Sequence, residues 1–469
     1  MTSIELSTVA VTSRDTETQH HQETVLTSNE EEPSRPNARP AIFRSTAQEV
    51  LFIFTATMSV AMPSFLQGSS LVVSSYIKKD LNMTTSQLTW MTASSALTSG
   101  SFLLFFGKVA DMFGRRGILL ISLFLFSIFN LATGFSKDAL TLDVLNGIMG
   151  WITALAIPAA QGTLGSIYDR PSKRKNYAFA CFSAGNHLGF VFSSILSGVA
   201  TQFFGWRASF WLLAVIYLAV AGIACFTVPP DDSEKLPLSL ESLKQFDVVG
   251  AALTVAGIGL FTAGISIGPN APEGWKTPYV LVFITLGLPL VATFIWWEGH
   301  FPHPLMPMKI WRKKEFALVI AGKILHRVSN KLLMGLGAFA FTVAFLLVAV
   351  QRSGVSYWAL TFPALAIVVV GTDFEFNVVN MYVLSSLPKS QQSIASSVFQ
   401  TTIKLAVTIG LSVCAAIFSS VSDNPATSGF YAHDPFEPYA ALFWFATAMS
   451  FISLLLVPFL KIKTQGHED

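Results

Sequence analysis

Long apolar runs alternate with short polar segments from about residue 50 to residue 460. Each run is near the length of about 20 residues that a helix needs to cross a bilayer. We delimit twelve such runs, at residues 50–73, 88–106, 117–136, 139–160, 177–199, 208–228, 248–268, 278–297, 332–350, 357–386, 393–419 and 439–460. The pattern predicts an all-α integral membrane protein that crosses the bilayer about twelve times.

The composition supports a multi-pass membrane protein. Hydrophobic residues make up 52% of the chain and charged residues only 12%, and the mean hydropathy is +0.55. These values exclude a soluble globular protein of this length. Residues 1–45 differ from the rest: they are rich in Ser, Thr, Glu and Pro. We expect them to form a disordered cytoplasmic tail, because they have too few large apolar side chains to fold.

Basic residues collect on one side of the predicted membrane. If the N-terminus is cytoplasmic, the outer loops hold only Lys78, Lys79, Lys137, Arg207, Lys276 and Arg352, and the inner loops hold most of the others. This orientation obeys the positive-inside rule and makes both termini cytoplasmic. The sequence Asn82-Met83-Thr84 then lies outside as a glycosylation sequon, in a short loop close to the membrane.

Sequence motifs of enzymes, metal sites and nucleotide-binding proteins are not found in a plausible context. The three cysteines, Cys181, Cys225 and Cys414, lie in apolar runs without metal-ligand or C-x-x-C spacing. We find no zinc-protease helix, nucleophile elbow or phosphate-binding loop. We therefore expect no enzyme, no ATP-driven pump, no metal or other cofactor, and no nucleic-acid partner.

A polar segment with two glycines, residues 107–116, separates the second apolar run from the third. Gly107 and Gly114 allow close helix approach and a tight reversal. Asp111 lies within reach of Arg115, four residues on, and of a neighbouring helix N-terminus, where a carboxylate is favoured. Arg115 and Arg116 mark the cytoplasmic side.

This segment resembles the G-x-x-x-D-x-x-G-R-R loop between the second and third helices of major facilitator superfamily transporters. In that family the loop latches one conformation of an alternating-access cycle. The resemblance implies a major facilitator fold and a conformational latch made of Gly107, Asp111, Gly114, Arg115 and Arg116. The alternative interpretation is an ordinary charged turn after a membrane helix.

Further segments narrow the resemblance, which covers about residues 45–460. They are Gly205-Trp206-Arg207, Phe246 to Ala251, His303 to Pro307, Trp311 to Phe316, Gly371-Thr372-Asp373 and Ser385 to Pro388. Together they are similar to the fourteen-helix fungal drug:proton antiporters, in the branch of aminotriazole-resistance, boron-efflux and low-affinity ammonium carriers. The resemblance implies export of a small molecule.

The second half of the chain departs from that family. Residues 322–331 resemble a second copy of the latch segment, with His326 in place of the acid, as an internal repeat would give. Only the six residues 316–321 separate this copy from the basic run that ends at Lys314. Six helical residues span roughly 9 Å, against a bilayer core of about 30 Å. Two helices are therefore expected to be missing, and an omitted exon or a gene-model error would explain the loss.

These observations predict five regions. Residues 1–45 form the tail, 46–230 a six-helix half, 231–298 two linker helices, 299–461 a half with four of the expected six helices, and 462–469 a second cytoplasmic tail. Helices of the missing kind line the transport cavity in this family, so transport by the chain as written is in question.

Polar residues at membrane depth are functional candidates, because such positions are costly to bury. Asp373 and Asn377 share a helix face with Asn380, whereas Glu375 points about 200° away from Asp373. Lys404 is the one cation found near the middle of a run, and an ion pair with Glu375 or Asp373 would neutralise both partners. A purely structural pair and a coupling role are both open.

His187 in the fifth run is either a neutral histidine bonded between helices or a protonation-linked gate. Gln67 and Asn146 are expected to point towards the same cavity. They replace an acid and an arginine of the antiporter family, and Ser193 to Gly198 lacks the proline of the family's fifth-helix motif. Proton coupling is therefore left open.

The leading hypothesis is a monomeric secondary transporter in the lipid bilayer that exports a drug, toxin, fungal metabolite or small inorganic solute. The plasma membrane is favoured, and the vacuolar membrane is the alternative. A second hypothesis, motivated by the missing helix pair, is a non-transporting membrane sensor or defective isoform.

Overall fold

A computed structural model describes residues 38–83, 85–168, 172–231, 246–268, 271, 273–302, 304–305, 328–385, 387–425 and 429–457. The chain separates into two units, Met1–Ala38 and Arg39–Asp469, and every element below belongs to the second. In the described residues the helices are α2 (Thr46–Asp80), α3 (Thr85–Phe113), α4 (Arg115–Thr133), α5 (Ala139–Ile167), α6 (Lys173–Phe204), α7 (Trp206–Thr227), α9 (Val248–Ile267), α10 (Pro278–Glu298), α13 (Val328–Ala349), α14 (Thr361–Ser385), α15 (Gln392–Asp423) and α16 (Glu437–Leu456), with short 3₁₀ turns at Gly274–Lys276 and Lys389–Gln391.

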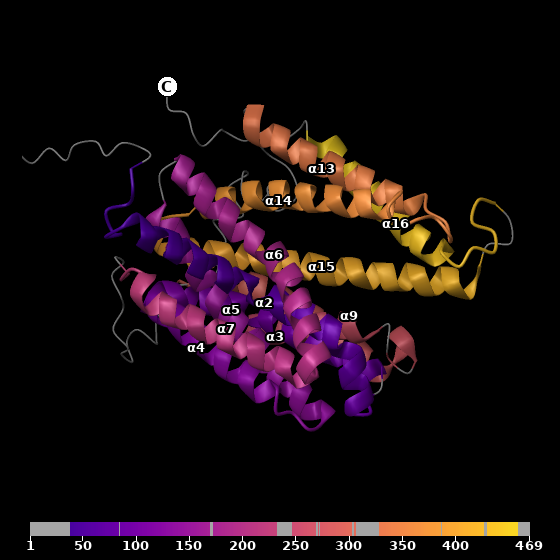
Figure 1. The fold of residues 1–469 in the computed structure, drawn as a ribbon, viewed down its shortest axis with the longest axis horizontal. Coiled ribbons are helices and arrows are strands. Elements are labelled where there is room, and N and C mark those ends of the chain that lie inside the picture. The colour runs from indigo at the N-terminus through magenta and orange to yellow at the C-terminus, as the bar shows by residue number, and fades with distance from the viewer. Residues whose placement is uncertain are drawn as a thin grey trace, which may run out of the picture. The chain divides into compact units, whose positions relative to one another are not determined.

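The all-helical membrane architecture expected from the apolar runs is confirmed (Figure 1). Each of the twelve α-helices in the described part overlaps one predicted run. Eleven are long and apolar enough to cross a membrane, and the stretch of α13 whose side chains the structure describes, Met334–Ala349, is apolar but shorter. Residues 306–327 lie outside the described part, so most of the second latch copy is not seen. The division into halves and linker stays a prediction.

Local sequence explains where several helices begin. Ser45, Asp138, Ser172 and Asp247 precede α2, α5, α6 and α9, and each side chain accepts a backbone N–H from the first turn of its helix. These N–H groups have no partner within the helix, so the caps stabilise the starts. The N–H of Thr141 also lowers the pKa of Asp138, which keeps this cap ionised.

Glycine allows two reversals that a side chain would strain. Gly114 has φ 104° between α3 and α4, and Gly205 has φ 84° between α6 and α7. Left-handed backbone of this kind favours glycine. The consecutive helices can therefore turn back after a single residue, which places both reversals at the ends of the spans.

The first six helices, α2 to α7, share the main buried core. In it α2 packs along α6, α3 along α5, and α4 against α5 and α7. Tyr217 of α7 is fully buried, and its ring meets Phe65 at 5.7 Å and Phe126 at 4.6 Å, both edge to face. Its hydroxyl donates to the Met58 carbonyl at 3.0 Å. Aromatic contacts and a satisfied polar tip thus hold α2, α4 and α7 together.

Among the last four helices, α13 to α16, a smaller group is built around α13 (Figure 1). In this group α13 packs against α14 and α16, whereas α15 makes its main contacts with α3 and α5. A loop cluster joins the ends of the group: Asp434 accepts the backbone N–H groups of Phe436 at 2.9 Å and Ser353 at 3.2 Å. The Phe436 N–H lowers the pKa of Asp434.

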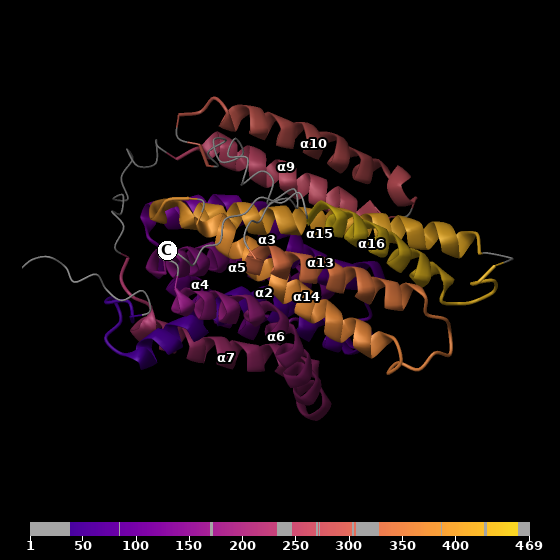
Figure 2. The ribbon, with the colours of Figure 1, turned by 90° about the horizontal axis from the view of Figure 1, so that it is seen from above.

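The helix pair α9 and α10 lies side by side (Figure 2). Beyond its partner, α9 touches both α3 and α15. Gly257 makes the pairing close, because a Cβ there would lie 2.9 Å from the backbone nitrogen of Val291 in α10. Small residues at helix crossings are typical of membrane proteins.

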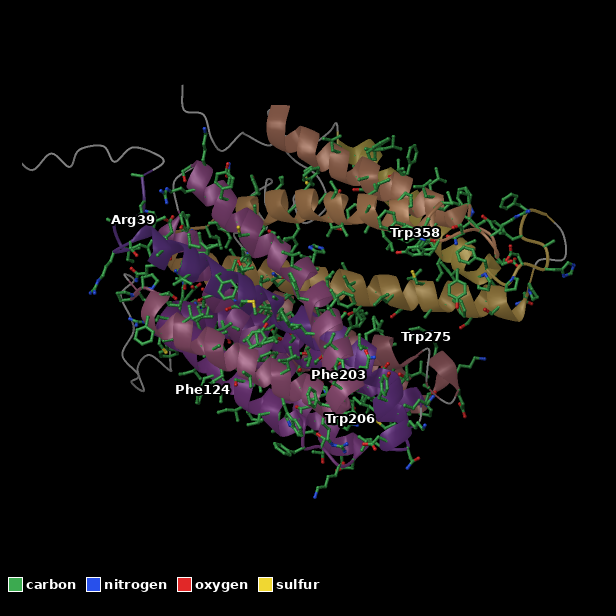
Figure 3. The ribbon with its side chains drawn as sticks, in the orientation of Figure 1. Arg39, Phe124, Phe203, Trp206, Trp275 and Trp358 are labelled. Carbon is green, nitrogen blue, oxygen red and sulfur yellow. The ribbon has the colours of Figure 1, made fainter. Side chains whose placement is uncertain are left out.

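Large apolar side chains cover much of the outer surface. Phe124 is 50% exposed and Trp358 69% exposed, and both are labelled in Figure 3. Exposed apolar side chains on this scale would be unusual in a soluble protein. A bilayer around the helices accounts for them, because lipid solvates such side chains.

We predict opposite effects for two glycine substitutions. A Cβ at Gly68 would lie 2.6 Å from the Phe190 carbonyl oxygen, where α2 crosses α6, whereas nothing lies within 4 Å of one at Gly222. Gly68→Ala should cost about 1–3 kcal/mol by overpacking, and Gly222→Ala should be neutral or stabilising by up to about 1 kcal/mol. Melting temperatures of the purified variants in detergent measure this, and equal shifts would contradict the described helix crossing.

Candidate functional site

Asp111, near the end of α3, is the centre of the candidate latch. Its carboxylate accepts two bonds from the Arg115 guanidinium, at 3.0 and 2.8 Å. It also accepts the backbone N–H groups of Ser393 at 3.2 Å and Ile394 at 3.0 Å, in the first turn of α15. Both contacts expected for Asp111 from the sequence are therefore present. Asp111 and Arg115 are about 95% buried, so water screens their attraction little.

Arg115 extends the contact to two more elements. Its guanidinium donates to the Ser393 hydroxyl at 2.9 Å and to the Gly162 carbonyl of α5 at 3.2 Å. A guanidinium supplies several N–H donors in one plane, so a single side chain can hold three partners. The result is a junction of α3, α4, α5 and α15.

The glycines bring the backbones together at this junction. The Cβ positions of Gly107, Gly162 and Gly165 are already occupied by side chains of α15, those of Ser397, Ser393 and Gln392. A side chain at any of these three positions would collide with α15 unless the α15 side chain moved away. The predicted latch residue Gly107 thus acts through close packing.

The other two predicted latch residues do not reach α15. Gly114 forms the reversal between α3 and α4. The backbone N–H of Arg116 donates to the Asp231 carboxylate at 3.2 Å, and its guanidinium donates to the Cys225 carbonyl at 3.3 Å. Arg116 therefore ties α4 to the end of α7 and to Asp231 just beyond it.

An amide network lies next to the junction. The Gln161 amide of α5 donates to the Asn380 side-chain oxygen of α14, and the Gln161 oxygen accepts the Ser396 hydroxyl of α15. All three side chains are buried. Gln161 therefore bonds to two other helices, and it closes α5 against α14 and α15.

A second polar cluster at the same end was missed in the sequence. Glu49 in the first turn of α2 is buried, and it accepts the Tyr168 hydroxyl at 2.8 Å and the Arg174 guanidinium at 2.5 Å. Burial, and then the bond to Glu49, raises the pKa of Tyr168, so the hydroxyl stays a donor. The signal was present as one acid at the start of a span opposite the basic run 173–175.

The α9–α10 pair is anchored to α3 beside the latch. The Lys108 ammonium donates to the Pro304 carbonyl at 3.2 Å, and the ring of Phe105 meets that of Phe246 at 5.4 Å. Asp247 accepts the Trp297 indole N–H at 2.9 Å. Parts of two family-like segments therefore meet here, and His303 lies outside the described residues.

A cavity of about 850 Å³ begins beyond the latch and follows α15 away from it. Its walls come from α2, α3, α5, α6, α9, α14, α15 and α16. Its polar lining consists of Ser64, Gln67, Asn186, Thr262, Gln400, Thr401, Lys404, Thr408, Ser412 and Ser419. The contribution of α9 was not expected, because the sequence predicts a linker helix there.

Three predicted site residues differ in their relation to this cavity. Gln67 lines it, as expected. Asn146 does not: it is buried in α5, where its amide donates to the Leu142 carbonyl at 2.9 Å. The expectation that Asn146 faces the cavity is therefore wrong. His187 is not a lining residue, but its neighbour Asn186 is, and Asn186 accepts the Ser64 hydroxyl across α2 and α6.

Lys404 lines the cavity and forms no ion pair with Glu375 among the described residues. Glu375 packs instead against Gly337 of α13, where a Cβ would lie 2.6 Å from its Cγ. The proposed Lys404–Glu375 pair is therefore wrong, since the two side chains meet different helices. The side chains of Asp373 and Asn377 lie outside the described part.

One acid within a predicted membrane-spanning run was overlooked in the sequence. Asp143 of α5 lies in a separate shallow hollow with Ser94, Thr98 and Trp151. Its sequence signal was the acid within the apolar run Leu140 to Leu145. The hollow is on another face of α3 from the main cavity, so Asp143 is not part of that lining.

Eight of the described helices surround a cavity with both apolar and polar lining residues, and a charged junction lies at one end of it. This arrangement is that of a helical membrane carrier. Residues 50–298 match the sequence profile of the Major Facilitator Superfamily, which is more than half of the chain. The chain belongs to this family. It is therefore a secondary transporter in a lipid bilayer, with a small-molecule substrate, and not an enzyme.

Relatives are distant. The chain is 26% identical to an uncharacterised transporter of Schizosaccharomyces pombe, over 80% of this chain and 81% of the relative. It is 26% identical to the low affinity ammonium transporter of Saccharomyces cerevisiae, over 72% and 75%. It is 21% identical to the aminotriazole resistance protein of the same yeast, over 86% and 83%.

A solved structure has the same fold. The human organic anion transporter MFSD10 superposes with a TM-score of 0.52 at 14% identity, over 89% of this chain and all of the other. At this identity the likeness concerns the fold alone.

The alignments with these relatives have more positions than the number of residues of this chain that they cover. The alignment with the S. pombe transporter has 428 positions, whereas 80% of 469 residues is about 375. At least about 50 positions of that relative therefore face gaps in this chain. The ammonium transporter gives a similar excess, with 392 positions against 72% of 469, about 338.

We predict that the buried latch pair matters far more than an exposed one. Asp111→Ala leaves Arg115 buried without its carboxylate and should cost about 3–5 kcal/mol of stability. Asp80→Ala breaks the Asp80–Arg207 pair, whose side chains are 48% and 35% exposed, and should cost about 1 kcal/mol. Thermal unfolding in detergent compares the two variants, and equal losses would contradict the importance of the buried junction.

Proposed function

We propose that this secondary transporter exports a small molecule by alternating access, and that its cargo is a drug, toxin, fungal metabolite or small inorganic solute. The observation that carries the proposal is the cavity of about 850 Å³ between α2, α3 and α6 on one side and α14 and α15 on the other. A cavity at the interface of two helix groups, with apolar walls and a few polar side chains, is typical of a small-molecule site.

The latch gives this cavity a closed end. Asp111 and Arg115 join α3 and α4 to α15, and Gln161 joins α5 to α14 and α15. Opening towards the cytoplasm would require the carboxylate to leave the N-terminus of α15, where the backbone N–H groups favour a negative charge. We propose that this step loads the cavity, and that closing the latch directs the cargo outward.

Export is preferred to uptake because of what the relatives are called. The aminotriazole resistance protein and the efflux pump terJ of Aspergillus terreus are among them, at 21% and 24% identity. The plasma membrane is the proposed address, with the vacuolar membrane as the alternative. Proton coupling is tested separately. The antiporter family has an acid at the position of Gln67, and the Gln67 amide cannot take up and release a proton as an acid does.

The full chain should protect a host that lacks its own efflux carriers. We expect it to raise the concentration of aminotriazole or borate that stops growth and to lower intracellular accumulation. Asp111→Asn should abolish this protection, since a neutral amide holds α15 and Arg115 less well, whereas Asp80→Asn should keep it. The same accumulation assay with a protonophore added tests whether export is coupled to protons. No protection against any solute in a broad panel, at equal surface expression, would overturn export.

A specific observation favours a second candidate, the non-transporting sensor or defective isoform. Within the described residues the group after α10 has four helices, α13 to α16, where two equal halves would need six. The alignment gaps of about 50 positions agree with a missing pair at about 20 residues per span. Such a protein would bind ligand without completing a cycle.

Sequencing the transcript across Phe316 to His326 separates the two candidates. We expect an insertion of roughly 40–50 residues, two spans of about 20 each, in the transporting form. A transcript that reads straight through would favour the second candidate. Adding the missing pair from a relative should then restore export if the cavity wall is what the chain lacks.

A further inference from the structure

We infer that the cavity binds an anion, an organic carboxylate or another oxyanion, through Lys404 of α15. The inference rests on the proposed function in one respect, that this cavity is the substrate site. It adds the chemical class of the substrate, argued from the residues that line the cavity.

Lys404 is placed in the cavity by its neighbours on α3. Its stem lies beside Gly100, where a Cβ would be 3.7 Å from the Lys404 Cδ, and Ala93 and Ala96 continue this face of small residues. The missing side-chain volume leaves room for the long lysine stem against α3. The cationic side chain is therefore a lining group of the cavity and not a lipid-facing one.

None of the acidic residues that the structure describes is a lining residue of the cavity. Asp111 is held in the latch, Glu375 packs against Gly337, and Asp143 lies in the separate hollow. Within the described part of the chain, no ion pair includes Lys404. A cation in a membrane interior is costly without a counter-charge. An anionic ligand would supply that charge when it enters.

Two residues of the lining carry a hydroxyl group that has no hydrogen-bond partner among the described residues. Within the part of the chain that the structure describes, these are the buried hydroxyls of Thr262 and Thr401. By contrast, the Thr402 and Thr408 hydroxyls of α15 donate to carbonyls one turn back, at 2.8 Å in each case. Hydroxyl groups on the same cavity lining as an ammonium group can donate to the several lone pairs of an oxyanion when they turn towards it.

The rest of the lining sets the kind of anion. Ile258, Phe376 and Leu411 give apolar walls, and the volume of about 850 Å³ admits a drug-sized molecule. Lysine is a point charge without the planar fork of arginine, so it does not require a bidentate carboxylate. Carboxylate, sulfonate and phosphate groups on an apolar body share the chemistry that this lining recognises.

The charge of the cavity can be measured with the chain's own Cys414, which lines it ten residues beyond Lys404. Cys181 and Cys225 are exposed, so Cys181→Ser and Cys225→Ser leave a single thiol. The purified full chain is treated with anionic sulfonatoethyl and cationic trimethylammonium-ethyl methanethiosulfonate. In each reaction the thiolate attacks the reagent sulfur, a disulfide forms and methanesulfinate leaves. Each rate is divided by that of a small thiol in water.

We expect the anionic reagent to be favoured. Ten residues of helix separate the two side chains by roughly 15 Å, and a unit charge at that distance in an effective dielectric of 20 changes a rate by about sixfold. The normalised rate should rise by this factor for the anion and fall by it for the cation. Lys404→Gln should bring the two rates together, and Lys404→Arg should keep the preference.

Equal rates with Lys404 present, or a preference for the cation, would overturn the inference, as would a thiol that neither reagent reaches. A second measurement uses benzoate, benzamide and benzylamine as protectants of Cys414 against the neutral methyl reagent. Benzoate should protect best, and only its protection should depend on Lys404.

The two proposals fail in different ways. An anion preference without export in the growth assay would remove the proposed transport and keep the binding site. Export of cationic solutes from a cavity with no anion preference would keep the proposed transport and remove the anion-binding site.

Discussion

A buried carboxylate near the end of α3, in contact with the start of α15, organises this molecule. Asp111 faces the N-terminal turn of α15 and is held by Arg115, which also binds α5. Ion pairs out of contact with water gain attraction but lose hydration, so they are stable only when further hydrogen bonds satisfy their atoms. Here the backbone of α15 and the Ser393 hydroxyl provide those bonds, and the glycines of α3 and α5 make the approach close enough. The position of α15, and with it one wall of the cavity, depends on this junction.

Much of the fold follows from the sequence for simple reasons. A helix in lipid must be apolar over about 20 residues and must satisfy its own backbone, so its position can be found in one dimension. The contacts of Asp111 were equally accessible, because Arg115 is one turn away on the chain and a carboxylate is stabilised by any nearby helix N-terminus.

The orientation of side chains around each helix was harder to predict. α9 is apolar on all sides, so its sequence does not indicate that Ile258 and Thr262 face a cavity. Asn146 satisfies its amide on its own helix, an option that no spacing rule excludes. Glu375 and Lys404 lie at similar depths, but whether they meet depends on the rotation of α14 against α13 and α15, which local sequence does not determine.

The unequal anchoring of α9 has a mechanical consequence. On the α3 side the pair α9–α10 is fastened by Lys108 to Pro304 and by Phe105 to Phe246. On the α15 side the hydrogen bond from Ser412 to the Ile265 carbonyl, at 3.2 Å, is the direct polar link among the described residues. If α3 and α15 separate during a transport cycle, the α9–α10 pair moves together with α3. The interface between α9 and α15 then becomes the place where the two helices slide. One wall of the cavity moves past the other along this interface.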